Sequence, residues 1–383
     1  MKKRPIVATY YFPNWHVDEC NEKLHGKGWT EWRVLQHATP RFPGHKQPKV
    51  PLWGYEDEAD PKVMAKKIEA ASCHGIDAFI FDYYWFSEGP YRERCLLEGF
   101  LPAPNCKDIK FALMWANHDP VYMHPCSYYD RCNNSTTLWP GTVSPETFIK
   151  CTDHIIETYF SRPNYLRIDG KLYFSIYNPS QMIRDLGGEK TARFLFDDFR
   201  ARVAAAGLGE LILDSRISAW DGWSWNSADW NADELSDRIR RAGFDMICLY
   251  GMGMRDGGFP SMDYADWIEK NKKMAAEINK RIGIPFNPSV STGWDVSPRT
   301  VQSDMYDPIG YPFMTVVVNS TPELFEKAFR HFYRAACEED SKAKLVNISC
   351  WNEWTEGSYL EPCQEYGYAR LEAVKRVVDE GRS

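Results

Sequence analysis

Two glutamates near the C-terminal end of the chain have the type and spacing that glycosidic-bond chemistry requires. Glu353 and Glu356 are three residues apart, lie beside Trp351 and Trp354, and are followed by Gly357. Cleavage of a glycosidic bond uses two carboxyl groups, one as an acid and the other as a base or a nucleophile. Indole rings offer flat apolar faces to sugars and lower the local dielectric, which raises the pKa of a nearby carboxyl group. Residues 351–357 are therefore the candidate catalytic motif.

The backbone around these glutamates decides whether they can cooperate. The apolar run 345–350 before the motif predicts a buried strand. If that strand continued, Glu353 and Glu356 would point to opposite faces, whereas in a helical turn residues i and i+3 share one face, about 5–6 Å apart at Cβ. We therefore expect a strand-end loop or a first helical turn. The alternative interpretation is that the tryptophans are core residues and both glutamates lie on an ordinary surface.

Composition indicates a globular enzyme. The 383 residues are 44% hydrophobic and 26% charged, as in ordinary soluble proteins. The net charge of −7 gives no basic footprint, so we expect no nucleic-acid partner. The 15% aromatic content is high and mildly favours a carbohydrate site. No run of about 18 apolar residues is present, so we expect no membrane span.

The cysteines favour a reducing compartment over a metal site. The eleven cysteines include no C-x-x-C pair and no matching histidine spacing, so the sequence predicts no zinc site. An odd number of scattered cysteines is typical of reducing compartments, and residues 6–12 are too short and tyrosine-rich for the apolar part of a signal peptide. We expect a cytoplasmic protein, or a periplasmic or exported one if a leader was removed. No cofactor is expected, and the oligomeric state stays open.

Eight short apolar runs alternate with helical patterns, which predicts an α/β chain. Prolines weaken the seventh run, and the N-cap and proline pairs at 60–61, 144–145 and 321–322 predict helix starts. Because parallel strands need helical crossovers, we expect one (β/α)₈ (TIM) barrel domain over residues 1–383, with inserted loops at the C-terminal face of the strands. A doubly wound sheet would need a glycine-rich phosphate loop after the first strand, and residues 11–15 are not one. The expected strands are residues 6–11, 76–81, 109–114, 172–176, 211–213, 246–249, 284–290 and 345–350.

Chemistry in such a barrel lies at the C-terminal ends of the strands. The expected strands end in side chains that hydrogen-bond to sugar hydroxyls or stack against sugar rings. The residues expected to bind substrate are Tyr11, Asn14, Trp15, His16, Trp29, Glu31, Asp82, Tyr84, Trp85, Trp115, Asn117, His118, Tyr177, Tyr250, Trp294, Asp295, Asn352 and Trp354.

Each of these residues has a structural alternative. A single aromatic residue at a strand end is more often a core residue, and a histidine is more often a structural residue than a ligand. For Glu31 the two roles, binding substrate and bracing the insert that carries it, have equal support from the sequence. Arg299 could clamp an anionic substituent, but we expect it to pair with Asp295 instead.

Two other kinds of hydrolytic site are not indicated. The sequence has no His-x-x-x-His or His-x-His ligand cluster, so we expect no metal. It also has no G-x-S-x-G elbow for a serine nucleophile. Of the kinds of hydrolytic site compared, a site that uses carboxyl groups is the one that the sequence favours.

Five aromatic-rich motifs together resemble the glycoside hydrolase family 99-like proteins. The resemblance extends from about residue 5 to residue 380. This group includes bacterial proteins from O-antigen and other polysaccharide gene clusters, often labelled putative glycosyltransferases. The motifs are YYFPNWH at 10–16, GWTEW at 28–32, PLWGY at 51–55, MWANH at 114–118 and WNEWTEG at 351–357.

Family 99 proper contains endo-α-1,2-mannosidases and mannanases, and the resemblance implies a (β/α)₈ barrel and retention of configuration. It implies that Glu353 acts as the base on the sugar 2-OH, which gives a 1,2-anhydro intermediate, and that Glu356 is the acid/base. Glu356 would then need a raised pKa, while Glu353 must be ionised. The chain is closer to the 99-like branch than to the mannosidases, so an α-mannoside is an expectation by analogy.

The sequence leaves three functions to compare. We expect a retaining glycoside hydrolase that acts on a polysaccharide or oligosaccharide. The alternative is a glycosyltransferase or transglycosylase in O-antigen or capsular polysaccharide assembly, although no D-x-D triplet follows a strand and no phosphate-binding loop is present. A non-catalytic glycan-binding barrel is the third.

Overall fold

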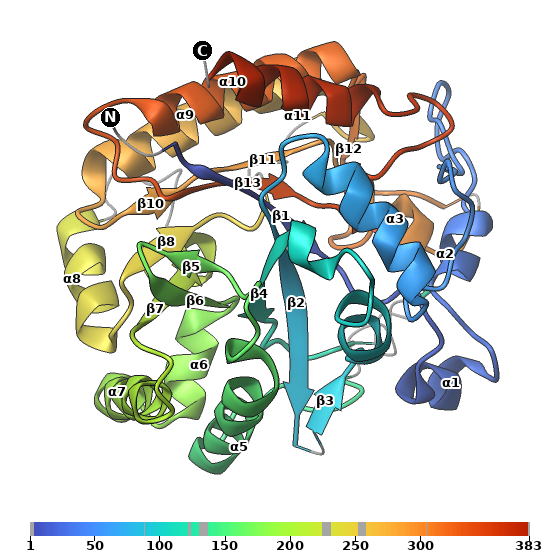
Figure 1. Cartoon of the computed structure of the whole chain (residues 1–383). Coiled ribbons are helices and arrows are strands. Elements are labelled where there is room, and N and C mark those ends of the chain that lie inside the picture. The colour runs from blue at the N-terminus through green and yellow to red at the C-terminus, as the bar shows by residue number, and fades with distance from the viewer. Residues whose placement is uncertain are drawn as a thin grey trace.

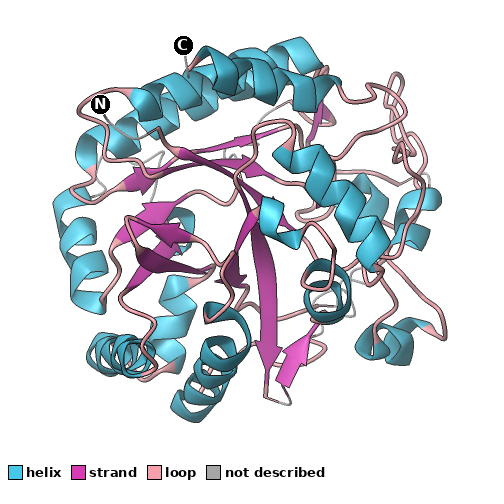
Figure 2. Ribbon diagram, in the orientation of Figure 1, coloured by secondary structure: helices cyan, strands magenta, loops and turns pink. Residues whose placement is uncertain are grey.

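The computed structural model describes residues 4–87, 89–121, 124–129, 137–223, 231–251, 258–303 and 305–381. Its central sheet is a barrel of parallel strands with helices around the outside (Figures 1 and 2). The strands pair in the order β10-β8-β7-β6-β4-β2-β1-β13-β11. These strands are β1 Ile6–Tyr11, β2 Ala78–Phe86, β4 Lys110–Trp115, β6 Lys171–Ile176, β7 Leu211–Arg216, β8 Met246–Cys248, β10 Phe286–Asn287, β11 Ser289–Ser291 and β13 Leu345–Ser349.

The two ends of the chain close the barrel. β1 pairs in parallel with β13, from Ile6 opposite Leu345 to Thr9 opposite Ile348, and its other edge pairs with β2. Every residue of β13 is buried, because one face of a barrel strand fills the interior and the other packs against helices. The predicted (β/α)₈ barrel is confirmed.

The seventh strand is interrupted, as its prolines predict. β10 pairs with β8 and β11 pairs with β13, with Pro288 between the two halves. Proline has no N–H for a ladder hydrogen bond, but its carbonyl still accepts from the backbone N–H of Asn347 at 2.9 Å. The side chain of Asn287 joins the halves to β13 by accepting from the backbone N–H groups of Lys344 and Leu345 at 3.0 and 3.1 Å.

Two strands extend beyond their predicted ends. β2 continues through Asp82 and Tyr84 to Phe86, and β7 continues through Asp214 to Arg216. The predicted ends at residues 81 and 213 were therefore too early. Polar and aromatic residues in these extensions resemble loop sequence, but they still pair with the neighbouring strands.

The helices form the outer layer, and their predicted starts are confirmed. The side chains of Asp60, Ser144 and Thr321 each accept a backbone N–H in the first turn, with proline at the next position. The larger helices are α3 Pro61–Ser72, α5 Pro145–Ile155, α7 Glu189–Ala205, α8 Ala232–Ala242, α9 Tyr264–Arg281, α10 Pro322–Cys337 and α11 Ala369–Glu380; the shorter ones are α1 Glu19–His25, α2 Trp32–Gln36 and α6 Pro179–Asp185.

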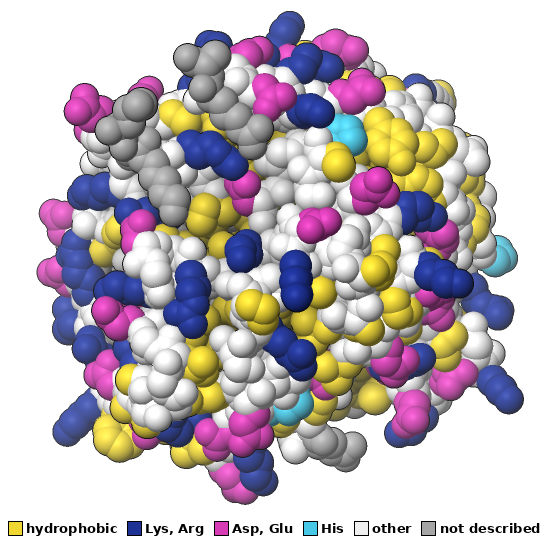
Figure 3. All heavy atoms as spheres, viewed as in Figure 1, with side chains coloured by type: hydrophobic (Ala, Val, Ile, Leu, Met, Phe, Trp, Pro, Cys, Tyr) yellow, Lys and Arg dark blue, Asp and Glu magenta, His cyan; other side chains and the backbone are white. Residues whose placement is uncertain are grey.

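Short elements decorate the barrel. Six short strands are β3 Gly89–Tyr91, β5 Arg167–Ile168, β9 Ser261–Asp263, β12 Val316–Val318, β14 Asn352–Glu353 and β15 Ser358–Tyr359. Basic and acidic side chains are interspersed on the face drawn in Figure 3. No helix in the described part of the chain is long and apolar enough to cross a membrane.

Candidate active site

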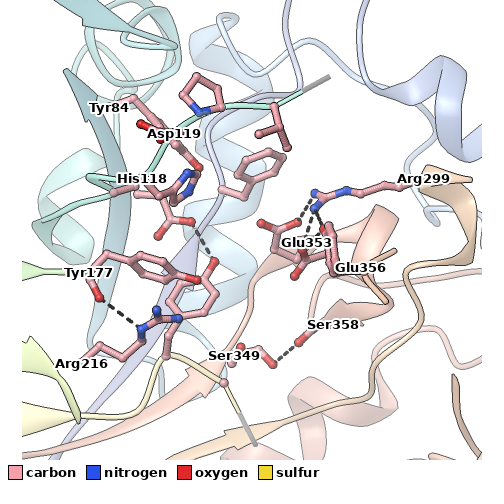
Figure 4. A pocket seen from close by; sticks show the side chains of 18 of the residues that line it. Tyr84, His118, Asp119, Tyr177, Arg216, Arg299, Ser349, Glu353, Glu356 and Ser358 are labelled. Carbon is pink, nitrogen blue, oxygen red and sulfur yellow. Dashed lines mark hydrogen bonds and ion pairs between the residues drawn. The ribbon is translucent and has the colours of Figure 1, made fainter. Parts of the chain in front are cut away.

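A cavity of about 770 Å³ lies at the carboxyl ends of the barrel strands, where the fold predicts chemistry. Figure 4 shows Glu353, Glu356 and Arg299 on one side of it and His118, Tyr177 and Arg216 on the other. Eight of the predicted residues line the cavity: Asp82, Tyr84, His118, Tyr177, Tyr250, Trp294, Glu353 and Glu356.

The motif leaves the last barrel strand as a tight turn. Glu353 ends β14, and residues 354–356 form a single 3₁₀ turn. The turn ends at Gly357 with a φ of 64°, where an added Cβ would lie 2.7 Å from the backbone nitrogen of Asp295. Only glycine fits this position. The expected strand-end turn is therefore present, and it brings both carboxyl groups to the same cavity.

One guanidinium connects the two glutamates. Nη1 of Arg299 lies 2.6 Å from Oε1 of Glu356, and Nη2 lies 3.2 Å from Oε2 of Glu353. Nη2 also lies 3.2 Å from Oε1 of Glu31, and the hydroxyl of Tyr311 donates to Glu356 at 2.9 Å. The predicted pairing of Arg299 with Asp295 is wrong. Asp295 instead accepts from His45 at 2.7 Å and from Gln47 at 2.6 Å.

A buried lysine is linked to residues of the 351–357 motif through two buried glutamates. Nζ of Lys67 lies 2.6 Å from Glu58 and 2.7 Å from Glu361. Glu58 accepts from the side-chain amide of Asn352 at 2.9 Å, and Glu361 accepts from the indole N–H of Trp354 at 2.8 Å. Asn352 and Trp354 belong to the motif, so this network fixes the backbone of the motif.

Glu31 is buried among polar contacts from several parts of the chain. Its carboxylate accepts from the side-chain amide of Asn14 at 2.6 Å and from the hydroxyl of Thr355, beside its ion pair with Arg299. Burial opposes ionisation, but His124 and Arg299 hold the pKa of Glu31 well below its ordinary value. Glu31 does not line the cavity, and it braces Arg299 and the motif instead.

Two carboxyl groups that line the cavity, those of Glu353 and Asp82, have raised pKa values. Burial raises the pKa of Glu353 well above its ordinary value, and the charge of Glu356 raises it further, whereas Arg299 opposes the shift. Burial also raises the pKa of Asp82 to about 8, although the hydroxyl of Tyr250 donates to it at 2.8 Å. The raised pKa expected for Glu356 stays a prediction. Its carboxylate accepts hydrogen bonds from Arg299 at 2.6 Å and from Tyr311 at 2.9 Å.

Ten further predicted residues are packed or hydrogen-bonded away from the cavity. Alternation in β2 explains one of them, because Asp82 and Tyr84 face inward while Trp85 lies on the other face near His154. Trp115 stacks on Phe148 of α5, with ring centroids 5.9 Å apart. The residues that do not line the cavity, besides Glu31 and Asp295, are Tyr11, Asn14, Trp15, His16, Trp29, Trp85, Trp115, Asn117, Asn352 and Trp354.

Most of these ten residues have specific structural contacts. Tyr11 donates to Glu58 at 2.8 Å, and the indole of Trp15 donates to the carbonyl of Asn352 at 2.9 Å. Asn117 exchanges hydrogen bonds with the backbone of Asn178, and Trp29 stacks on His25. Burial lowers the pKa of His16 to about 4.

Several cavity residues were not predicted, and arginines are prominent among them. Arg216 shares a face of β7 with Asp214, so a longer predicted strand would have placed it at the strand end. Arg92 follows the β2–β3 hairpin, and Tyr311 lies in a loop, where no sequence signal marks them. Among the described residues, no group of three or more His, Cys, Asp and Glu is arranged to hold a metal ion.

The barrel and the glutamates at the end of its last strand define a glycoside hydrolase-like architecture. The model of the glycosyltransferase WbsX family matches residues 7–374, and the chain belongs to that family. Two curated relatives from strains of Xanthomonas campestris pv. campestris, both described as uncharacterized protein WxcX, are 25% identical over 387 residues. The match covers 97% of this chain and 49% of the relatives, so the chain spans about half of their length.

Solved structures share the fold across the whole chain. A GH99 endo-α-mannosidase from Bacteroides thetaiotaomicron, in complex with bis-tris-propane, aligns with a TM-score of 0.58 and 17% identity, covering 100% of this chain and 98% of that one. A structure described as a glycoside hydrolase-like protein aligns with a TM-score of 0.59 and 16% identity, covering 98% and 94%. The resemblance to family 99-like proteins is thus confirmed, with the WbsX family shown by the family model and the shared fold shown by the solved structures.

Proposed function

We propose that the protein is a retaining glycoside hydrolase that cleaves an oligosaccharide or polysaccharide with Glu353 and Glu356 as its catalytic pair. The observation that carries this proposal is the convergence of both carboxyl groups on one guanidinium at the wall of the cavity. A cavity of about 770 Å³ is in the range that encloses most of a ligand larger than one sugar. Its aromatic lining provides faces for sugar rings.

The proposed mechanism uses the sugar itself as the nucleophile. Glu353 takes the proton of the 2-OH, the 2-oxygen attacks C1, and the bond from C1 to the leaving oxygen breaks as Glu356 protonates that oxygen. Water then opens the 1,2-anhydro sugar at C1, giving one proton to Glu356 while Glu353 returns its proton to the 2-oxygen. Two displacements at C1 retain the configuration. A base with a raised pKa suits a weakly acidic hydroxyl, provided that it is ionised at the working pH.

The test is hydrolysis of a panel of α-1,2-linked manno-oligosaccharides and related bacterial glycans, followed by NMR of the anomeric protons. The wild type is compared with Glu353→Gln and Glu356→Gln, and with Glu339→Gln at an exposed position as the matched control. We expect cleavage with retention, lost in both motif variants and kept in the control. Cleavage that survives in either motif variant would remove that residue from the catalytic pair.

A glycosyltransferase is the second candidate, and the description of the WbsX family favours it. A transferase would consume a nucleotide sugar only when an acceptor is present. Release of nucleoside diphosphate from a panel of nucleotide sugars with acceptor glycans, in the absence of any hydrolysis, would replace the hydrolase proposal. Glycan binding without either reaction, unchanged in Glu356→Gln, would indicate a non-catalytic binding barrel.

A further inference from the structure

The wall of the cavity opposite the glutamates carries two arginines, and three rings in edge-to-face contact lie between them. The guanidinium of Arg92 lies 4.7 Å from the ring centroid of Tyr84, and that of Arg216 lies 3.6 Å from the ring centroid of Tyr177. The ring of His118 lies between them, 6.1 Å from Tyr84 and 5.5 Å from Tyr177. All five residues line the cavity. We call them the arginine wall, part of which is visible in Figure 4.

Arg216 is held in place but is not neutralised. It is the last residue of β7, and its Nε donates to the carbonyl oxygen of Tyr177 at 3.1 Å. Stacking on Tyr177 and this one hydrogen bond fix the plane of the guanidinium. Among the described residues no carboxylate forms an ion pair with it and no group accepts a hydrogen bond from its two Nη groups, so these donors face the cavity for a ligand.

Arg92 is also without an ionic partner, and it is more enclosed. Its guanidinium lies within 4.5 to 4.9 Å of the ring centroids of Phe12, Tyr84 and Tyr91, and its Nε is buried with no hydrogen-bond partner among the described residues. Within the described ranges no carboxylate pairs with it. Removing a charge from water without a partner is costly, so an anion that reaches this wall gains an unusually favourable site.

Asp82 and Asp119, which line the cavity near the wall, do not cancel these two charges; the charge of Glu31 acts on Arg92 as well, but Glu31 forms its ion pair with Arg299. Asp82 carries its proton up to about pH 8 because burial raises its pKa. Asp119 accepts from the backbone N–H of Gly141 at 2.6 Å and forms no ion pair with either arginine. Burial and the charges of both arginines lower the pKa of His118 to about 4, so its ring is neutral at neutral pH. In contrast, Arg299 across the cavity is paired with three carboxylates.

We propose that the arginine wall is an anion subsite, and that the glycan bound by this protein carries a carboxylate or phosphate group that reaches this side of the cavity. This inference rests on the proposed function and names its substrate class as acidic glycans. A planar guanidinium matches the paired oxygens of either group. The catalytic glutamates lie on the opposite side of the cavity, so the anion binds away from them.

The test compares two sugars that differ only in charge. Binding of methyl α-D-glucuronide and of methyl α-D-glucoside is measured by saturation-transfer NMR titration on the wild type, Arg216→Gln and Arg92→Gln. Arg238→Gln is the matched control, because Arg238 also lies over an aromatic ring, at 5.6 Å from Trp220, but is paired with Glu189 and does not line the cavity. Circular dichroism confirms that each variant is folded.

We expect the wild type and Arg238→Gln to bind the glucuronide about tenfold or more tightly than the glucoside, as a charge-assisted contact predicts. Arg216→Gln should reduce that preference to within about twofold, and salt should weaken it. Equal binding of the two sugars to the wild type, or no binding of the glucuronide, would overturn the proposal, as would a preference that survives in both cavity variants. If Arg92→Gln does not fold, Arg216→Gln alone decides.

Further measurements show which kind of molecule carries the anion, and they test this inference separately from the proposed function. Glucose 1-phosphate and uridine diphosphate are titrated in parallel, and preferential binding of the diphosphate would assign the wall to a nucleotide sugar. Glu353→Gln should lose cleavage but keep the preference for the glucuronide. Cleavage of neutral glycans without that preference would reject the subsite alone, and the preference without any cleavage would reject the hydrolase alone.

Discussion

Arg299 binds Glu356 through Nη1 at 2.6 Å, and the adjacent nitrogen of the same guanidinium lies 3.2 Å from Glu353. One cation therefore contacts both carboxyl groups of the proposed catalytic pair. Glu353 must be ionised to act as a base, and its pKa is raised by burial and by Glu356 and lowered by Arg299. This balance makes the pH dependence of activity predictable.

The first prediction concerns the acid limb of the plot of kcat/KM against pH, which reports the free enzyme. Since a base with a raised pKa stays protonated to higher pH, the acid limb should lie above the ordinary glutamate range, about 4.3. Arg299→Gln removes the charge that lowers the pKa of Glu353, so the limb should move further up. Tyr311→Phe keeps that charge and serves as the control. A wild-type limb near the ordinary value would argue against Glu353 as the base.

The second prediction separates the roles of the two glutamates. An aryl glycoside with an acidic phenol needs little protonation of its leaving oxygen, so it should restore much of the activity of Glu356→Gln. It should not restore Glu353→Gln, because the 2-OH still needs a base. Natural substrates should lose about 10²–10⁴-fold in kcat in both variants. Selective rescue of Glu353→Gln would exchange the roles, in agreement with the raised pKa of Glu353 in the free site.

The third prediction concerns Asp82 and stability. Its pKa rises from 3.8 in the unfolded chain to about 8 in the folded protein. The folded state therefore holds a proton that the unfolded state releases, and stability falls as pH rises from about 4 to about 8. Asp82→Asn should remove the contribution of Asp82 to the slope of unfolding free energy against pH, which is up to about 1.4 kcal/mol per pH unit. Urea unfolding at pH 5, 6, 7 and 8 measures this slope. Parallel pH profiles for the wild type and the variant would contradict it.

A structural role for Lys67 gives the fourth prediction. Lys67→Met leaves Glu58 and Glu361 buried without their cation, which should cost about 3–5 kcal/mol of unfolding free energy. Lys66→Met, one residue earlier on α3, breaks a partly exposed pair with Glu56 and should cost at most about 1 kcal/mol. Denaturant unfolding of both variants measures the difference. Equal effects would show that the buried network does not hold the motif in place.

Local sequence was enough to predict the barrel, the helix starts and the turn that carries the glutamates. Each depends on a short-range signal: an apolar run, an N-cap before proline, or a glycine after a strand. The tertiary contacts of the site could not be predicted in this way. Arg299 was expected to pair with Asp295, four positions away, but the fold supplies His45 to Asp295 and three glutamates to Arg299.

Local sequence also could not predict which strand-end side chains enter the cavity. Their clustering at one end of the barrel followed from the fold, but whether a side chain enters the cavity depends on where the strand ends. Because β2 extends to Phe86, its alternation sends Tyr84 inward and Trp85 outward. Because β7 extends to Arg216, an arginine and not Asp214 stands at its end.

The pairing of β1 with β13 also sets the order of events during synthesis. Roughly 330 residues separate the end of β1 at Tyr11 from the start of β13 at Leu345. At 5–20 residues per second the ribosome needs roughly 15–70 s to make them. Throughout that time one edge of β1 has no partner from its own chain, and exposed strand edges favour aggregation. The rate of translation and the chaperones that attend it should therefore govern how much of this protein reaches its closed form.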